Sequence, residues 1–146
     1  MKISTRSRYG LRLMLELAIN YQKGPIFLRD IAEKEDISEK YLSQIVIALK
    51  ARNLINSLRG FRGGYVLARS PSCITLKEIV EEMEGGLSLV PCLSNPLICE
   101  RKSRCATRDI WDSLRVLLAE KLESLTLKDL IRINREKKEK NIMYNI

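Results

Sequence analysis

Three of the four cysteines lie close together in the second half of the chain. Cys92, Cys99 and Cys105 fall within fourteen positions, in a stretch from 87 to 106 that contains two prolines and shows neither helical nor strand periodicity. A loop of this kind can bend until three thiols converge, and soft thiolates suit zinc and iron–sulfur clusters. The spacing lacks the paired Cys-x-x-Cys knuckles of a zinc ribbon. The triad therefore indicates a metal or cluster centre, with a regulatory disulfide or cysteines without a role as the alternatives.

Basic residues surround this triad and would favour the thiolate form of the cysteines, which serves both metal ligation and redox sensing. They are Arg101, Lys102, Arg104 and Arg108. The fourth cysteine, Cys73, lies apart, just before a predicted helix. We expect it to be a small buried residue with no role.

The chain contains no histidine, which excludes Ser-His-Asp and Cys-His catalysis and histidine zinc sites. Since no other catalytic residues are evident, we expect the protein not to be an enzyme and to have no small-molecule substrate. No stretch approaches the ~20 apolar residues of a membrane span, and charged residues stand where a signal peptide has its apolar segment. We therefore expect a cytoplasmic protein without a membrane partner.

The net charge of +8 is distributed unevenly along the chain. Residues 1–70 hold 13 Lys and Arg against 6 Asp and Glu, whereas residues 71–146 hold 13 against 12. A basic first half beside a nearly neutral second half is typical of a nucleic-acid-binding module joined to another unit. An anionic membrane surface would attract the same charge, so the pattern of elements has to decide.

Apolar spacing predicts three helices in the basic half, followed by a hairpin. The helices are expected over 5–22, 28–35 and 39–52. Ser38 is a suitable N-cap for the third. Two short strands, 54–58 and 65–68, enclose the glycine-rich turn Arg59–Gly64. Because a hairpin after a helix-turn-helix is a wing, the sequence predicts a mainly α fold with a small β-hairpin, in which a winged helix-turn-helix is joined to a long dimerisation helix.

The second half is predicted to begin with a helix from Thr75, which forms a capping box with Glu78, to Gly85. After the cysteines, apolar residues at the spacing of a helix seam predict a long helix over 107–125. The seam comprises Trp111, Leu114, Leu118, Leu122 and Leu125. A short helix opens at Thr126, and the charge run after it is expected to fray. The chain is thus divided into a DNA-binding region 1–70, a linking helix with the cysteine-bearing cluster loop 71–106, a dimerisation helix with the C-terminal helix 107–134, and a charged tail 135–146.

Two sets of residues in the first region could contact double-stranded DNA. In the third helix, Lys40, Ser43 and Gln44 turn hydrogen-bonding groups outward for base edges, and Tyr41 could bond a phosphate. In the wing, Arg59 and Arg62 lie in a turn that Gly63 helps to close, where they could meet phosphates or a minor groove. The alternative is a protein-interaction domain with solvated lysines.

The chain resembles the IscR, NsrR and CymR group of bacterial winged-helix transcription regulators over nearly its whole length. The resemblance rests on five features: the opening Met-Lys-Ile-Ser-Thr with Arg8-Tyr9, Ile37-Ser38 before Tyr41-Leu42 and Gln44, Leu54-Ile55, the run Arg59-Gly60-x-x-Gly63-Gly64-Tyr65, and the cysteine triad followed by Trp111. Members without the cysteines are apo-regulators. The triad therefore places this chain in the cluster-binding, IscR-like branch.

The resemblance implies a homodimer joined by the helix 107–125 and an iron–sulfur cluster held by Cys92, Cys99 and Cys105, with [2Fe–2S] ahead of [4Fe–4S]. At the position of the fourth cluster ligand, this sequence differs from the other members of the group. IscR-like members have a histidine where Arg108 stands, and NsrR-like members have an aspartate where Arg8 stands. Glu100, Asp109, a residue of the partner subunit or solvent are the candidates in their place.

The sequence thus predicts a DNA-binding transcription regulator whose operator binding is controlled by an iron–sulfur cluster. One alternative is a cluster-free repressor of the same fold, controlled by thiol oxidation or by a protein partner. A second alternative, of another class, is a small iron–sulfur carrier. Only three clustered thiols and the presence of a wing count against the carrier.

Overall fold

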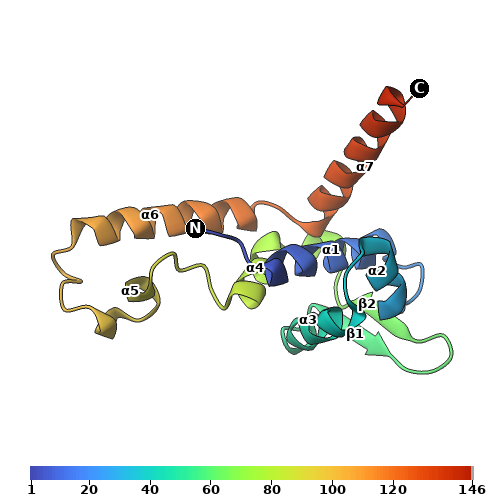
Figure 1. Ribbon diagram of the computed structural model, residues 1–146, viewed down its shortest axis with the longest axis horizontal. Helices are drawn as coiled ribbons and strands as arrows, with labels where there is room; N and C mark the ends of the chain where they lie inside the picture. The colour runs from blue at the N-terminus through green and yellow to red at the C-terminus, as the bar shows by residue number, and fades with distance from the viewer. Residues whose placement is uncertain (146) are drawn as a thin grey trace.

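Three helices and a β-hairpin form the first half of the protein, in a computed structural model that describes residues 1–145. The elements are α1 (Thr5–Ile19), α2 (Leu28–Glu35), α3 (Glu39–Ala51), β1 (Ile55–Leu58) and β2 (Gly64–Leu67). The predicted winged helix-turn-helix is confirmed, with boundaries that differ by no more than three residues. Figure 1 shows the hairpin beside α3 and below α1.

Local signals account for these boundaries. The Ser4 hydroxyl accepts a hydrogen bond from the Ser7 N–H at the start of α1, and the Ser38 hydroxyl accepts one from the Tyr41 N–H at the start of α3. Between α2 and α3, Asp36 adopts a left-handed conformation with φ 52°. That conformation turns the chain tightly enough to bring the two helices together.

The wing contains more than the two predicted strands. β1 and β2 pair antiparallel, with Ile55 opposite Leu67, and Ile26 forms a bridge to Tyr65 on the other edge of β2. The Ile26 backbone lies so close to Gly64 that a Cβ there would stand 2.5 Å from the Ile26 carbonyl oxygen. A glycine at position 64, which has φ +130°, is therefore required for the segment at Ile26 to pair with β2.

The second half begins with the 3₁₀ turn η1 (Pro71–Cys73) and α4 (Leu76–Glu84), which packs on α1 and α3. The predicted capping box of Thr75 and Glu78 is present, and Gly85 ends the helix in a left-handed conformation. Cys73 is exposed, contrary to the prediction, because the neighbouring Ile74 occupies the core position.

One aliphatic core unites these helices with the hairpin; its fully buried members include Leu13, Met14, Leu42, Ile45, Leu49, Ile55, Ile79 and Leu127.

The cysteine loop, residues 87–106, holds two short turns, α5 (Pro91–Ser94) and η2 (Pro96–Ile98). Each begins with a proline, whose fixed φ suits the first position of a helical turn. The loop leads into α6 (Ala106–Glu123). Figure 1 shows α5 near the end of α6 that lies farthest from α7.

The last helix, α7, spans Leu127–Tyr144 and is far longer than the predicted short helix. The run Arg135–Lys140 is helical instead of frayed, because Glu, Lys and Arg are good helix formers and pairs such as Arg132 with Glu136, 3.2 Å apart, support the exposed turns. Ile146, the last residue of the predicted tail, lies outside the described residues.

The turn between α6 and α7 is fixed to the start of α4. Thr75 and Thr126 form an antiparallel bridge, in which the Leu76 N–H donates to the Leu125 carbonyl at 2.8 Å and the Leu127 N–H to the Ile74 carbonyl at 3.0 Å. Both long helices therefore leave the winged helix from one anchored point (Figure 1). Within residues 1–145, no helix combines the length and apolar character needed to cross a membrane.

Candidate DNA-binding face and cysteine loop

The outward side of α3 carries the predicted base-reading residues. Lys40, Ser43 and Gln44 are exposed, while Leu42 and Ile45 on the opposite side are buried in the core. The Ser43 hydroxyl donates to the Glu39 carbonyl at 2.9 Å, which orients it along the helix. Tyr41 is half-buried, and its ring stands edge-on to Tyr9 with centroids 5.7 Å apart.

The wing places its two arginines in solvent. Arg59 and Arg62 are exposed, and Phe61 between them is 97% exposed. Gly63 is instead buried inside the turn, where its N–H donates to the Gly60 carbonyl at 3.0 Å. A Cβ at Gly63 would stand 2.5 Å from the Leu58 carbonyl oxygen, so this glycine shapes the turn that presents the arginines.

A groove between α2, α3 and the wing is lined by residues of all three elements. It encloses about 560 Å³, and Ser43 from α3 and Arg59 from the wing both line it. Arg29 in the first turn of α2 and Ser57 of β1 line the same groove and were not predicted. Ile47, 70% exposed on the outward side of α3, was not predicted as a DNA contact. On a recognition helix, such a side chain can contact a thymine methyl group.

The three cysteines occupy three separate turns of the cysteine loop. Cys92 lies in α5, Cys99 follows η2 and Cys105 is the N-cap of α6; all three are free thiols and partly exposed. A hydrogen bond with the Thr107 hydroxyl, 3.3 Å away, and one from the Arg108 N–H hold the pKa of the Cys105 thiol below its usual value. The lowered pKa favours the thiolate.

The long helix α6 has no buried residue. Its apolar residues Ile110, Leu114 and Leu117 are exposed and follow one another at steps of four and three, with Trp111 beside them. We call these four residues the apolar stripe. The predicted seam is divided, because Leu122 and Leu125 at its far end pack against the core of their own chain.

Residues 3–133 match the model of the Rrf2 family, which is described as an iron-dependent transcriptional regulator. The chain belongs to the Rrf2 family. Among its relatives, the HTH-type transcriptional regulator CymR of Bacillus subtilis (strain 168) is 42% identical over 130 residues, 89% of each chain. The Rrf2 family assignment agrees with the predicted likeness to IscR and CymR.

Solved structures of Rrf2 relatives share the fold. CymR of B. subtilis, described as the global cysteine regulator, matches with a TM-score of 0.77 and 41% identity, over 91% of this chain and 98% of that one. IscR of T. potens matches with a TM-score of 0.78 and 33% identity, over 94% and 90%. The oxidized form of Staphylococcus aureus CymR matches with a TM-score of 0.73 and 35% identity, over 90% and 96%.

This Rrf2 protein is therefore a DNA-binding transcription regulator and not an enzyme, as predicted. The alternative of a small iron–sulfur carrier does not agree with the family. The alternative of a protein-interaction domain with solvated lysines does not agree either.

The cysteine loop fits an iron–sulfur cluster in donor chemistry. Three free thiols lie in one loop, and the side-chain Nε of Arg108, in the first turn of α6 after Cys105, is buried without a hydrogen-bond partner. An unsatisfied guanidinium donor is suited to an anionic group such as a thiolate-bound cluster. The thiols do not meet in this conformation: across residues 1–145, no three Cys, Asp or Glu side chains lie close enough together to hold a metal ion.

Proposed function

We propose that this Rrf2 protein is a regulator whose operator binding is controlled by an iron–sulfur cluster in the cysteine loop, held by Cys92, Cys99 and Cys105. The observation that carries the proposal is the loop itself, in which three free, partly exposed thiols precede the buried, unpartnered Nε of Arg108. A bound cluster supplies a centre whose presence and oxidation state depend on iron supply and on oxidants.

The cluster type is proposed as [2Fe–2S], with [4Fe–4S] as the second choice. Neither Arg108 nor Arg8 is a suitable ligand, because a guanidinium stays protonated in proteins. Glu100, Asp109, a residue of the partner subunit or solvent would complete the site. Arg108 would serve instead as a hydrogen-bond donor to the anionic centre.

On the DNA side, we propose that α3 lies in the major groove, with Lys40, Ser43 and Gln44 toward the bases. The amide of Gln44 can pair bidentately with adenine, whereas Tyr41 is placed for a phosphate. Arg59 and Arg62 of the wing would contact phosphates or enter the adjacent minor groove, with Gly63 fixing the turn between them.

The functional unit is proposed to be a homodimer of this chain. The apolar stripe of α6 leaves four large side chains 40–61% exposed, and a second copy of α6 would bury them further. A dimer would also set the spacing between two recognition helices, which must match the spacing of two half-sites on DNA.

A continuous set of contacts leads from the cysteine loop to α3. The loop ends at the N-cap of α6, and α6 packs along α4, where Lys77 and Glu123 form an ion pair at 3.0 Å. The helix α4 in turn packs against α1 and α3. We propose that ordering of the loop shifts α6 on α4 and so changes the relative position of the two recognition helices in the dimer.

Control by thiol oxidation without a cluster is the second candidate. It is favoured by the partial exposure of the three free thiols, which leaves each accessible to an oxidant. A CymR relative has been solved in an oxidized form, which adds support for thiol chemistry in this group of regulators.

An absorption spectrum of the anaerobically purified protein, with iron and sulfide assays, tests the cluster. We expect visible absorption that is lost on Cys92→Ala, Cys99→Ala or Cys105→Ala and retained on Cys73→Ala, the matched control. The three apo variants should stay folded and bind operator DNA with altered affinity. If the wild-type protein contains no iron and its operator affinity responds to an oxidant, the cluster proposal is wrong and control by thiol oxidation takes its place. Full operator affinity in all four variants, with or without oxidant, would show that the loop has no sensing role.

A further inference from the structure

A second groove lies between the end of α1, η1 and α7. It encloses about 550 Å³, which is within the size range of small-ligand sites. We call it the basic groove, because four cationic side chains line it and no carboxylate does. These are Lys23, Lys128, Arg135 and Lys138.

The cations of the basic groove are positioned by the helical repeat of α7. Lys128, Arg135 and Lys138 fall on one side of the helix with Ile131, at steps of three, four and three. Lys23 approaches from the turn after α1. Across residues 1–145, none of these four cations forms an ion pair, although the Asp129 carboxylate attracts Lys128 at longer range.

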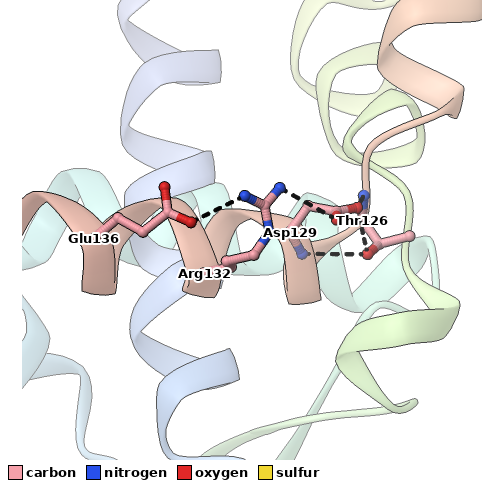
Figure 2. A network of polar contacts seen from close by, with 4 residues as sticks. All are labelled: Thr126, Asp129, Arg132 and Glu136. Carbon is pink, nitrogen blue, oxygen red and sulfur yellow. Dashed lines mark hydrogen bonds and ion pairs between the residues drawn. The ribbon is translucent and has the colours of Figure 1, made fainter.

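Two of the three acidic residues of α7, Asp129 and Glu136, are engaged by Arg132. Figure 2 shows Asp129 bonded to Thr126 in the capping box and facing Arg132, with Glu136 on the other side of the same arginine. The Arg132 guanidinium lies 3.8 Å from the Asp129 carboxylate and 3.2 Å from that of Glu136. These carboxylates are therefore paired with an arginine that does not line the basic groove.

The remaining lining combines hydroxyl donors with an apolar floor. Ser70, the N-cap of η1, and Ser72 within η1 bring two hydroxyls 3.0 Å apart to the groove, and Ala18, Pro71 and Ile131 supply the apolar surface. A ligand with an anionic group and an organic body would match both parts. A bare metal cation or a neutral apolar compound would not.

We propose that the basic groove binds a small organic phosphate, with the phosphate groups on the four cations and the organic part on the apolar floor. The inference is independent of the proposed cluster and of the DNA-binding face, since the groove shares no residue with either. Arg135 and Lys138 lie beyond the residues matched to the Rrf2 family.

Titration calorimetry with metal-free ADP as the probe, at physiological salt, tests the groove. We expect saturable one-to-one binding, weakened about tenfold or more by Lys128→Gln with Arg135→Gln, because two charged contacts to phosphate are lost. The matched control, Lys137→Gln with Lys140→Gln, removes the same charge from α7 outside the groove and should change the affinity less than twofold.

Two results would overturn the proposal. One is the absence of saturable ADP binding, or equal weakening by both double variants, which would reduce the effect to overall charge. The other concerns operator binding measured without ADP. If Lys128→Gln with Arg135→Gln loses operator affinity and the control variant does not, the cations contact DNA phosphates instead. Since ADP binding is read without DNA, iron or oxidant, this test can fail while the proposed function stands.

Discussion

Replacing Leu127 by alanine should loosen both C-terminal helices from the winged helix. This side chain is fully buried at the first position of α7, directly after the bridge between Thr75 and Thr126. It joins the core that includes Ile74 and Ile79 of the α4 region. Its loss therefore affects the one point from which both α6 and α7 depart.

The size of the effect follows from the burial. Leu127→Ala removes three carbon atoms from the core, a transfer cost of about 2.4 kcal/mol at roughly 0.8 kcal/mol per methylene. The cavity left behind adds to this, and comparable fully buried leucines cost about 3 to 5 kcal/mol in total. We expect a loss of about 3 to 4 kcal/mol in the free energy of unfolding.

Urea unfolding followed by circular dichroism measures this loss, at equal protein concentration for each variant because a dimer would make the midpoint concentration-dependent. Leu97→Ala is the matched control, since Leu97 is 86% exposed in the cysteine loop and its truncation should stay within about 0.5 kcal/mol. A loss below about 1 kcal/mol in the free energy of unfolding for Leu127→Ala would refute the anchored turn, because truncation of a fully buried leucine destabilises a protein by more than this.

Three further predictions address pH, DNA and assembly. Partial burial acts to raise the pKa of Glu84, but hydrogen bonds from the Ser7 and Ser4 side chains and the Ser4 N–H outweigh it and hold the pKa below its usual value. Glu84→Gln should therefore cost about 0.5 to 1.5 kcal/mol in urea unfolding at neutral pH, and the difference from wild type should vanish as acid protonates the native carboxylate; a constant difference down to about pH 3 would contradict it. Arg59→Ala should weaken operator binding in a mobility-shift titration by about 1 to 3 kcal/mol, and unchanged affinity would remove the wing from the contact surface. Leu117→Asp should yield monomer by light scattering, because Leu117 is 61% exposed in the apolar stripe; a folded dimer would place the interface elsewhere.

Elements with local signals could be predicted from the sequence. The capping box of Thr75 and the left-handed Gly85 delimit α4 as expected, because both act through residues within one turn. The hairpin follows from its glycines and β-branched residues. The bridge from Ile26 to β2 could not be predicted, since nothing near Ile26 in the sequence identifies Tyr65 as its partner.

The errors concern residues whose environment depends on distant contacts. The charge run of α7 has no apolar periodicity, so its helix depends on propensity and ion pairs that a search for a buried face overlooks. The seam of α6 follows one period, yet Leu122 packs on its own chain while Leu114 is exposed, because α4 covers only one end. Similarly, thiol spacing identifies the cysteine loop but does not determine how its separate turns place Cys92 and Cys105.

The anchor at the α6–α7 turn restricts which insertions and deletions α6 can accept. Each residue added to α6 between Cys105 and Glu123 would advance the helix by about 1.5 Å and rotate its far end by about 100° about the axis. Such a change would turn the apolar stripe and the end of the cysteine loop away from their present directions while the anchor stayed fixed. Length variation should therefore be tolerated between Gly85 and Cys92, whereas within α6 only changes close to whole turns would preserve the helical phase.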